Sequence, residues 1–187
     1  LGWLIGVPLL IWTVTGLWMV ARPIEEVRGV HLKAKPPMLS LEKAAVPPFM
    51  FGKFPDVQSM RLEQQWTGPM WVVSFADGSE RRASALDGRW LSLSEAEARA
   101  IADGWYSPKS AIVSVRKTAA NAPPIDLRKD RPAWGVTFAD GAHVYVDADT
   151  GGLLAIRSGQ WRAFDFMWGL HIMDLQTREN TSHPILI

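Results

Sequence analysis

The 187-residue sequence contains no cysteine, which excludes a disulfide framework and any metal site built on thiolates. It also lacks a charge bias, because 20 lysines and arginines stand against 19 aspartates and glutamates. Without a basic stripe, nucleic acid is not an expected partner. Nucleophile motifs, phosphate-binding loops and metalloprotease patterns are missing as well. We therefore predict no catalytic residues and favour a binding role for this chain.

Charge is also missing from residues 1–21. At about 1.5 Å per residue, a helix of this length crosses a ~30 Å hydrocarbon core. Trp3, Trp12, Trp18 and Arg22 are typical of anchors at a membrane–water interface. The pattern predicts a transmembrane helix at residues 1–21, and the alternative is a buried helix of a soluble domain. Because the chain has no initiator Met and ends in an apolar run, we expect it to belong to a longer protein.

One short stretch occurs twice. Residues 71–78 read WVVSFADG and residues 134–141 read WGVTFADG. In both copies Trp, Val and Phe occupy alternate positions, which is the period of a half-buried strand. The Asp-Gly pair that follows suits a tight hairpin turn. The repeat predicts two copies of one β-meander, with the two Trp-Val-Phe rows facing inward at equivalent places.

Helix signals precede each meander. Ser40 is a candidate N-cap for a short helix, which the following Pro-Pro pair must end. Ser94 and Glu97 form a capping box that opens a second helix, and Gly104 is a natural residue to follow its end. The predicted fold class is α+β, with two units that each pack a helix on an antiparallel meander. The predicted strands are 57–63, 71–75, 80–85, 90–91, 111–116, 134–138, 142–146 and 153–156.

The apolar period becomes helical from Trp161 onward. Phe164, Trp168, His171 and Leu175 recur at the spacing of one helix face. Aromatic rings with polar edges suit a membrane interface, so Trp161, Phe164 and Trp168 are the predicted interface residues of an amphipathic, membrane-proximal helix. The predicted boundaries are 1–21 for the transmembrane helix, 22–39 for a juxtamembrane linker, 40–91 and 92–160 for the two units, and 161–187 for the last segment, which ends in the start of a second span.

Five stretches, taken in this order, carry a resemblance to a known family. They are PLLIWTVTG at 8–16, the paired FADG turns, VDADTG at 146–151 and FMWGLH at 166–171. Together they resemble the PepSY family, and more narrowly the PepSY-associated transmembrane proteins of bacteria. The resemblance implies a duplicated PepSY unit on the periplasmic side of the bacterial inner membrane, flanked by membrane helices.

Three functions from different classes follow. The leading one is a membrane-anchored periplasmic module that binds or scaffolds a partner, such as another membrane protein subunit or span. The second, implied by the resemblance, is part of a haem-containing membrane reductase that serves iron or siderophore uptake. The third, also implied by the resemblance, is a propeptide-like regulator of a peptidase.

His171 is the residue on which the second function depends. An imidazole on an apolar face is either an interface histidine hydrogen-bonded to a backbone or carboxylate group, or an axial haem ligand. His183 is a further candidate ligand, but on a continuous helix it would lie about 18 Å away. A second ligand would then come from another span or a partner chain. Asp147 and Asp149 lack the downstream glutamate of a calcium loop, so we predict that they cap a turn.

Overall fold

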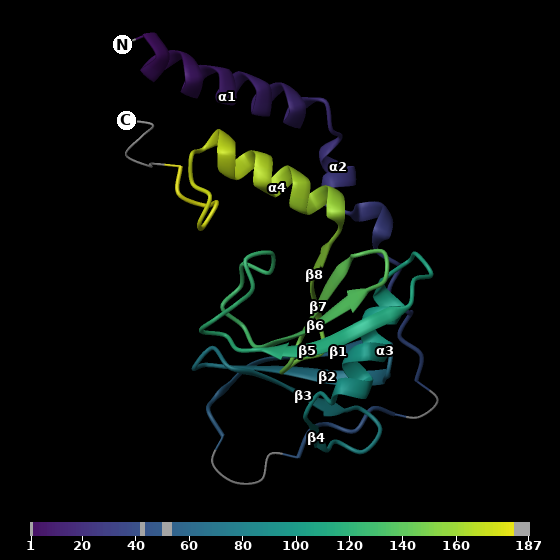
Figure 1. Ribbon diagram of the computed structural model, residues 1–187. Helices are drawn as coiled ribbons and strands as arrows, with labels where there is room; N and C mark the ends of the chain where they lie inside the picture. Colours follow the sequence, from purple (N-terminus) through teal and green to yellow (C-terminus); the bar gives the residue numbers. More distant parts are fainter. Residues whose placement is uncertain (1, 42–43, 50–53, 182–187) are drawn as a thin grey trace. The chain divides into compact units, whose positions relative to one another are not determined.

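The computed structural model describes residues 2–41, 44–49 and 54–181 (Figure 1). The chain divides into two compact units, which are described separately below. One contains Leu1–His31 and Arg157–Ile187, and the other contains Leu32–Ile156. The elements in chain order are α1 (Gly2–Val20), α2 (Ile24–Val27), the 3-10 turn η1 (Val30–Leu32), β1 (Val57–Gln65), β2 (Gly68–Phe75), β3 (Glu80–Ser84), β4 (Trp90–Leu91), α3 (Glu95–Trp105), β5 (Ile112–Thr118), β6 (Ala133–Phe138), β7 (His143–Asp147), β8 (Leu153–Arg157) and α4 (Gly159–His171).

The fold class is α+β, with two four-stranded antiparallel sheets ordered β1-β2-β3-β4 and β5-β6-β7-β8. The two predicted hairpins have the same geometry. Gly78 and Gly141 adopt positive φ angles of 82° and 81°. In each turn the aspartate one residue before the glycine accepts a hydrogen bond from a backbone N–H two residues later, at 2.9 Å for Asp77 and 3.0 Å for Asp140.

The duplication extends into the strand before each hairpin. β1 and β5 both carry an irregularity of register after their first residue, at Val57 and Ile112. The residue after each Phe also makes the same contact: the N–H groups of Ala76 and Ala139 each donate at 2.8 Å to the carbonyl before the strand. Both meanders were therefore predicted correctly, strand by strand, to within a few residues.

The main core lies between α3 and one face of the second sheet. Val136 and Phe138 of β6 are at most 1% exposed, and Ile101 and Ala102 of α3 are fully buried against them. The equivalent Val73 and Phe75 of β2 are buried to the same degree. The tryptophan of each predicted row is only half-buried. The inward orientation of the two rows is thus confirmed for valine and phenylalanine.

Two predictions about helices in this unit are wrong. Residues 40–41 and 44–46 are not helical, so no helix is described at Ser40; residues 42–43 lie outside the described residues. Gly104 does not follow α3 but lies inside it, because the helix continues to Trp105. A Cβ on Gly104 would lie 2.2 Å from the Trp66 indole, so this glycine allows β1 and its following turn to approach the helix closely. The capping box of Ser94 and Glu97 is present as predicted.

The other unit packs α1 against α4. Trp18 meets Phe164 at a centroid distance of 6.3 Å, and Gly16 lies where a Cβ would be 3.3 Å from the His171 ring. Within the described part of the chain, no helix combines the length and the apolar character that crossing a membrane requires. This finding corrects the prediction of a transmembrane helix at residues 1–21. The helix that forms there has 19 residues and includes Pro8, two threonines and several glycines.

The chain after α4 folds back on the helix. The N–H groups of Gln176 and Thr177 donate to one Asp174 carboxylate oxygen, and those of Glu179 and Asn180 donate to the other. The Thr177 hydroxyl hydrogen bond and these backbone donors lower the pKa of Asp174. The predicted helical face therefore stops short of Leu175, which lies beyond α4 and is exposed.

Candidate functional site

His171 is held at the end of α4 by three side chains. Its ring stacks on Trp12 at a centroid distance of 5.3 Å and on Trp168 at 6.3 Å, with interplanar angles of 22° and 24°. Its Nδ1 lies 3.0 Å from the Thr15 hydroxyl, which is 3% exposed. The partner is thus a hydroxyl, whereas the sequence suggested a backbone or carboxylate group.

The contacts of Thr15 decide which ring nitrogen carries the proton. The Thr15 hydroxyl donates to the carbonyl of Ile11 at 2.7 Å, as threonines within helices commonly do. With its proton used, the hydroxyl oxygen is left to accept from an Nδ1–H of His171. A neutral imidazole in this state keeps an unprotonated Nε2, and among the described residues no group hydrogen-bonds to that nitrogen.

The remaining predicted anchor and interface residues also belong to this unit. Trp3 is 86% exposed, and Arg22 lies over the Trp18 ring at 4.8 Å. The guanidinium of Arg157 lies over the Trp161 ring, 4.2 Å from its centroid. Phe164 and Trp168 contact Trp18 and His171 as described above, so they pack within the unit. His183 lies outside the described residues.

The predicted capping of the turn after β7 is confirmed for Asp147. Asp147 accepts from the N–H groups of Asp149 and Thr150 at 2.9 Å each, and its other oxygen pairs with Arg131 at 2.6 Å. This ion pair joins the turn to the loop that carries Arg131. Over the parts of the chain that the structure describes, no cluster of three metal-ligating side chains occurs.

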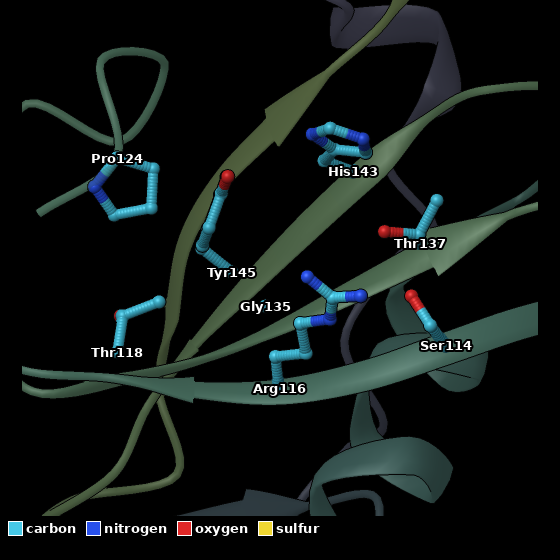
Figure 2. Close-up of a pocket in the computed structure, with 8 residues that line it drawn as sticks. All are labelled: Ser114, Arg116, Thr118, Pro124, Gly135, Thr137, His143 and Tyr145. Carbon is cyan, nitrogen blue, oxygen red and sulfur yellow. The ribbon is translucent and has the colours of Figure 1, made fainter.

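A different site emerges on the face of the second sheet that α3 does not cover. Alternate residues of β5 point to this face, and they are polar: Ser114, Arg116 and Thr118. Strand pairing aligns Ser114 with Thr137 of β6, and Arg116 with Gly135. With residues from β7 and the 119–132 loop, they line a cleft of about 380 Å³ (Figure 2). The full lining is Ser114, Arg116, Thr118, Pro124, Gly135, Thr137, His143 and Tyr145.

Strand pairing continues both rows onto β7. Thr137 pairs with His143, and Gly135 pairs with Tyr145. Gly135 allows the Tyr145 ring to lie close against the sheet, because a Cβ there would lie 3.0 Å from that ring. Figure 2 shows Arg116 reaching across the strands, with the Thr137 hydroxyl turned toward its guanidinium. The sheet therefore presents hydroxyl and guanidinium groups side by side on an open surface.

Asp126 organises one wall of the cleft from the loop between β5 and β6. Asp126 is 6% exposed, and its carboxylate accepts from the Tyr145 hydroxyl at 2.6 Å and from His143 Nδ1 at 2.9 Å. Burial alone would raise the pKa of Asp126, but the hydrogen bonds from His143 and Tyr145 outweigh that effect and lower it. Because an ionised carboxylate only accepts, the His143 proton sits on Nδ1. The Asp126–His143–Tyr145 group is thereby fixed in one arrangement.

The rest of the cleft contains side chains with unused hydrogen-bonding groups, namely Arg116, Ser114 and Thr137. Among the described residues, none of their side chains has an ion pair or a hydrogen bond. The sequence alone did not predict this cleft. The signal was present in the alternation of Ser114, Arg116 and Thr118, but Asp126 lies in a loop whose course the sequence does not predict.

Comparisons with known protein families, with the curated proteins and with the solved structures found no match to this chain.

Proposed function

We propose that this chain is a binding module of the PepSY type that holds a partner within an assembly at a membrane. The observation that carries the proposal is the cleft on the open face of the second sheet. Its guanidinium belongs to the exposed Arg116 and its hydroxyls to the half-buried Ser114 and Thr137, while the Asp126–His143–Tyr145 group beside them is fixed by hydrogen bonds. Fixed walls beside open donors are the arrangement of a preformed binding site.

The exposed surface of α1 also supports an assembly. Many apolar side chains of this helix are exposed, and most of those named below are more than half exposed. They include Trp3, Ile5, Leu9, Leu10, Trp12, Val14, Leu17 and Val20. Contiguous apolar surface of this extent on a folded protein marks an interaction site. The proposal therefore gives the protein two contact regions, one polar on the second sheet and one apolar on α1.

Photocrosslinking in the cells that make the protein tests the polar region. A photoreactive amino acid replaces Thr137 in the cleft, and in a matched control it replaces Arg99, which is exposed on α3. We expect Thr137 to give one defined crosslinked protein that Arg99 does not give, and Arg116→Gln to weaken that crosslink. Identical products from both positions, or none from Thr137, would overturn the proposal.

A second function, part of a haem-containing membrane reductase, is favoured by the His171 cluster. A haem-ligating histidine commonly donates from its other nitrogen to a fixed acceptor, which orients the ring. Thr15 supplies that acceptor, and Trp12 and Trp168 hold the ring faces. Among the described residues, His171 would hold the haem iron through Nε2, with Thr15, Trp12 and Trp168 fixing its ring. Bound haem would supply electron transfer, and the protein would supply ligation and ring orientation.

An absorption spectrum of the protein purified from its native cells tests this second function. We expect a Soret band that His171→Ala abolishes and that Thr15→Val shifts, because Thr15→Val removes the acceptor without removing the ligand. Trp161→Phe, which alters an aromatic residue away from His171, is the control and leaves the band unchanged. A protein without a Soret band leaves His171 as a packing residue that joins α1 to α4.

A further inference from the structure

We propose that the cleft on the second sheet binds an organic carboxylate, held by the guanidinium of Arg116. This inference deepens the binding function proposed above and rests on it. It names the chemical group that the partner, or a small molecule, presents to the sheet. Three features of the cleft carry it, namely its charge, its hydrogen-bonding groups and its size.

Charge selects an anion with a single negative charge. Arg116 contributes one positive charge that no described acidic group pairs with. The Asp126 carboxylate is already hydrogen-bonded by His143 Nδ1 at 2.9 Å and by the Tyr145 hydroxyl at 2.6 Å. A dianion would therefore bring a second negative charge toward Asp126 without a second cation to meet it. One fixed positive charge beside an occupied acid matches a monoanion.

Geometry selects a planar, two-oxygen group among monoanions. The guanidinium presents parallel N–H groups whose spacing matches the two oxygens of a carboxylate. Ser114 and Thr137 pair across β5 and β6 in the row next to Arg116, so their hydroxyls are placed to donate to the same group. Gly135 lies opposite Arg116 and leaves room for the Tyr145 ring, which forms the adjoining wall. The carboxylate would lie between the guanidinium of Arg116 and the Thr137 hydroxyl.

The volume of the cleft indicates a ligand larger than an isolated ion. A cleft of about 380 Å³ lies at the lower end of the range for sites that bind small organic molecules. The Tyr145 ring and Pro124 line the wall on the loop side, and they offer apolar contact to whatever carries the carboxylate. Both a free organic acid and the C-terminal carboxylate of a peptide have this chemistry. The experiment separates these two sources.

The test is an NMR titration of the isotope-labelled full-length protein. The probes are acetate, butyrate, inorganic phosphate, a short peptide with a free C-terminus, and the same peptide with an amidated C-terminus. We expect saturable shifts at the Arg116 side chain and at the amides of Thr137 and Tyr145 with butyrate, stronger than with acetate. A larger response to the free peptide than to butyrate identifies a peptide source, and the reverse identifies a free acid.

Variants show whether the guanidinium is responsible. Loss of a hydrogen bond to a charged group predicts that Arg116→Gln weakens carboxylate binding about 10- to 100-fold. Arg99→Gln, which removes an exposed guanidinium from α3, leaves binding unchanged, and Arg116→Lys keeps the charge but loses most of the two-point contact. The proposal is overturned if Arg116→Gln binds as the parent does, if phosphate binds more tightly than butyrate, or if no probe gives saturable shifts in the cleft.

The two proposals fail in different ways. A partner that crosslinks at Thr137, combined with no carboxylate binding, retains the binding function and rejects the carboxylate as its ligand. Carboxylate binding without a crosslinked partner retains the ligand class and rejects the partner-binding role.

Discussion

Truncation of Phe138 to alanine tests the duplicated core directly. The ring is 1% exposed, and its centroid lies 4.5 Å from that of Tyr106 at the end of α3. Removing a buried aromatic side chain forfeits about 1.5–3 kcal/mol of burial. The cavity that remains adds a further cost, which brings the expected loss in the free energy of unfolding to about 3–5 kcal/mol. Phe75→Ala, at the equivalent position of the first meander, should cost a similar amount.

Urea unfolding of the full-length protein, followed by far-UV circular dichroism, measures both losses. Leu86→Ala is the control, because Leu86 is 71% exposed in a turn and its truncation should change stability by less than about 0.5 kcal/mol. A loss below about 1 kcal/mol for Phe138→Ala would remove this ring from the core. A large loss for only one phenylalanine would show that the two meanders do not contribute alike.

Three further predictions concern the same unit. Glu97→Gln should cost about 1.5–3 kcal/mol, because the Arg82 side chain is fully buried and Glu97 is its charged partner at 2.6 Å; a loss in denaturant midpoint no larger than that of Leu86→Ala would contradict this. Gly104→Ala should destabilise by about 1–3 kcal/mol despite the better helix propensity of alanine, since the new Cβ overlaps Trp66; a raised melting temperature would show that the indole moves freely. Burial alone would raise the pKa of Glu80, but hydrogen bonds from Arg131 and Ser74 lower it. The ionised Glu80 carboxylate therefore stabilises the fold above the ordinary glutamate pKa of about 4.3, and this stabilisation is lost as the pH falls below that value. Glu80→Gln should therefore flatten the loss of stability between about pH 5 and pH 3, and an unchanged acid profile would refute this role.

The local features of the fold could be predicted because their causes are local. Period-two alternation and Asp-Gly turns fix both hairpins, and the Ser94–Glu97 capping box fixes the start of α3. The position of Gly104 within α3 was not predicted, because a glycine is needed there to let Trp66 approach the helix, and that contact joins distant parts of the fold. The predicted helix at Ser40 failed because an N-cap signal alone does not supply a packed apolar face.

The sites depend on contacts between distant segments, which explains what the sequence missed. His171 was singled out correctly as a residue that needs a partner, but Thr15 lies 156 positions earlier in the chain. Asp126 reaches His143 and Tyr145 only because the 119–132 loop folds over the sheet. The apolar character of residues 1–21 was read as a membrane span, whereas α1 also contributes Thr15 and Trp12 to the cluster around His171.

The most direct test of the central claim, that the cleft on the second sheet binds the partner, is an affinity measurement with the protein that Thr137 crosslinks. Isothermal titration calorimetry would compare the parent chain with Arg116→Gln and Arg99→Gln. Binding through the cleft predicts a dissociation constant at least about ten-fold higher for Arg116→Gln, and one unchanged for Arg99→Gln. Equal affinities for all three proteins would contradict the claim and place the contact elsewhere on the molecule.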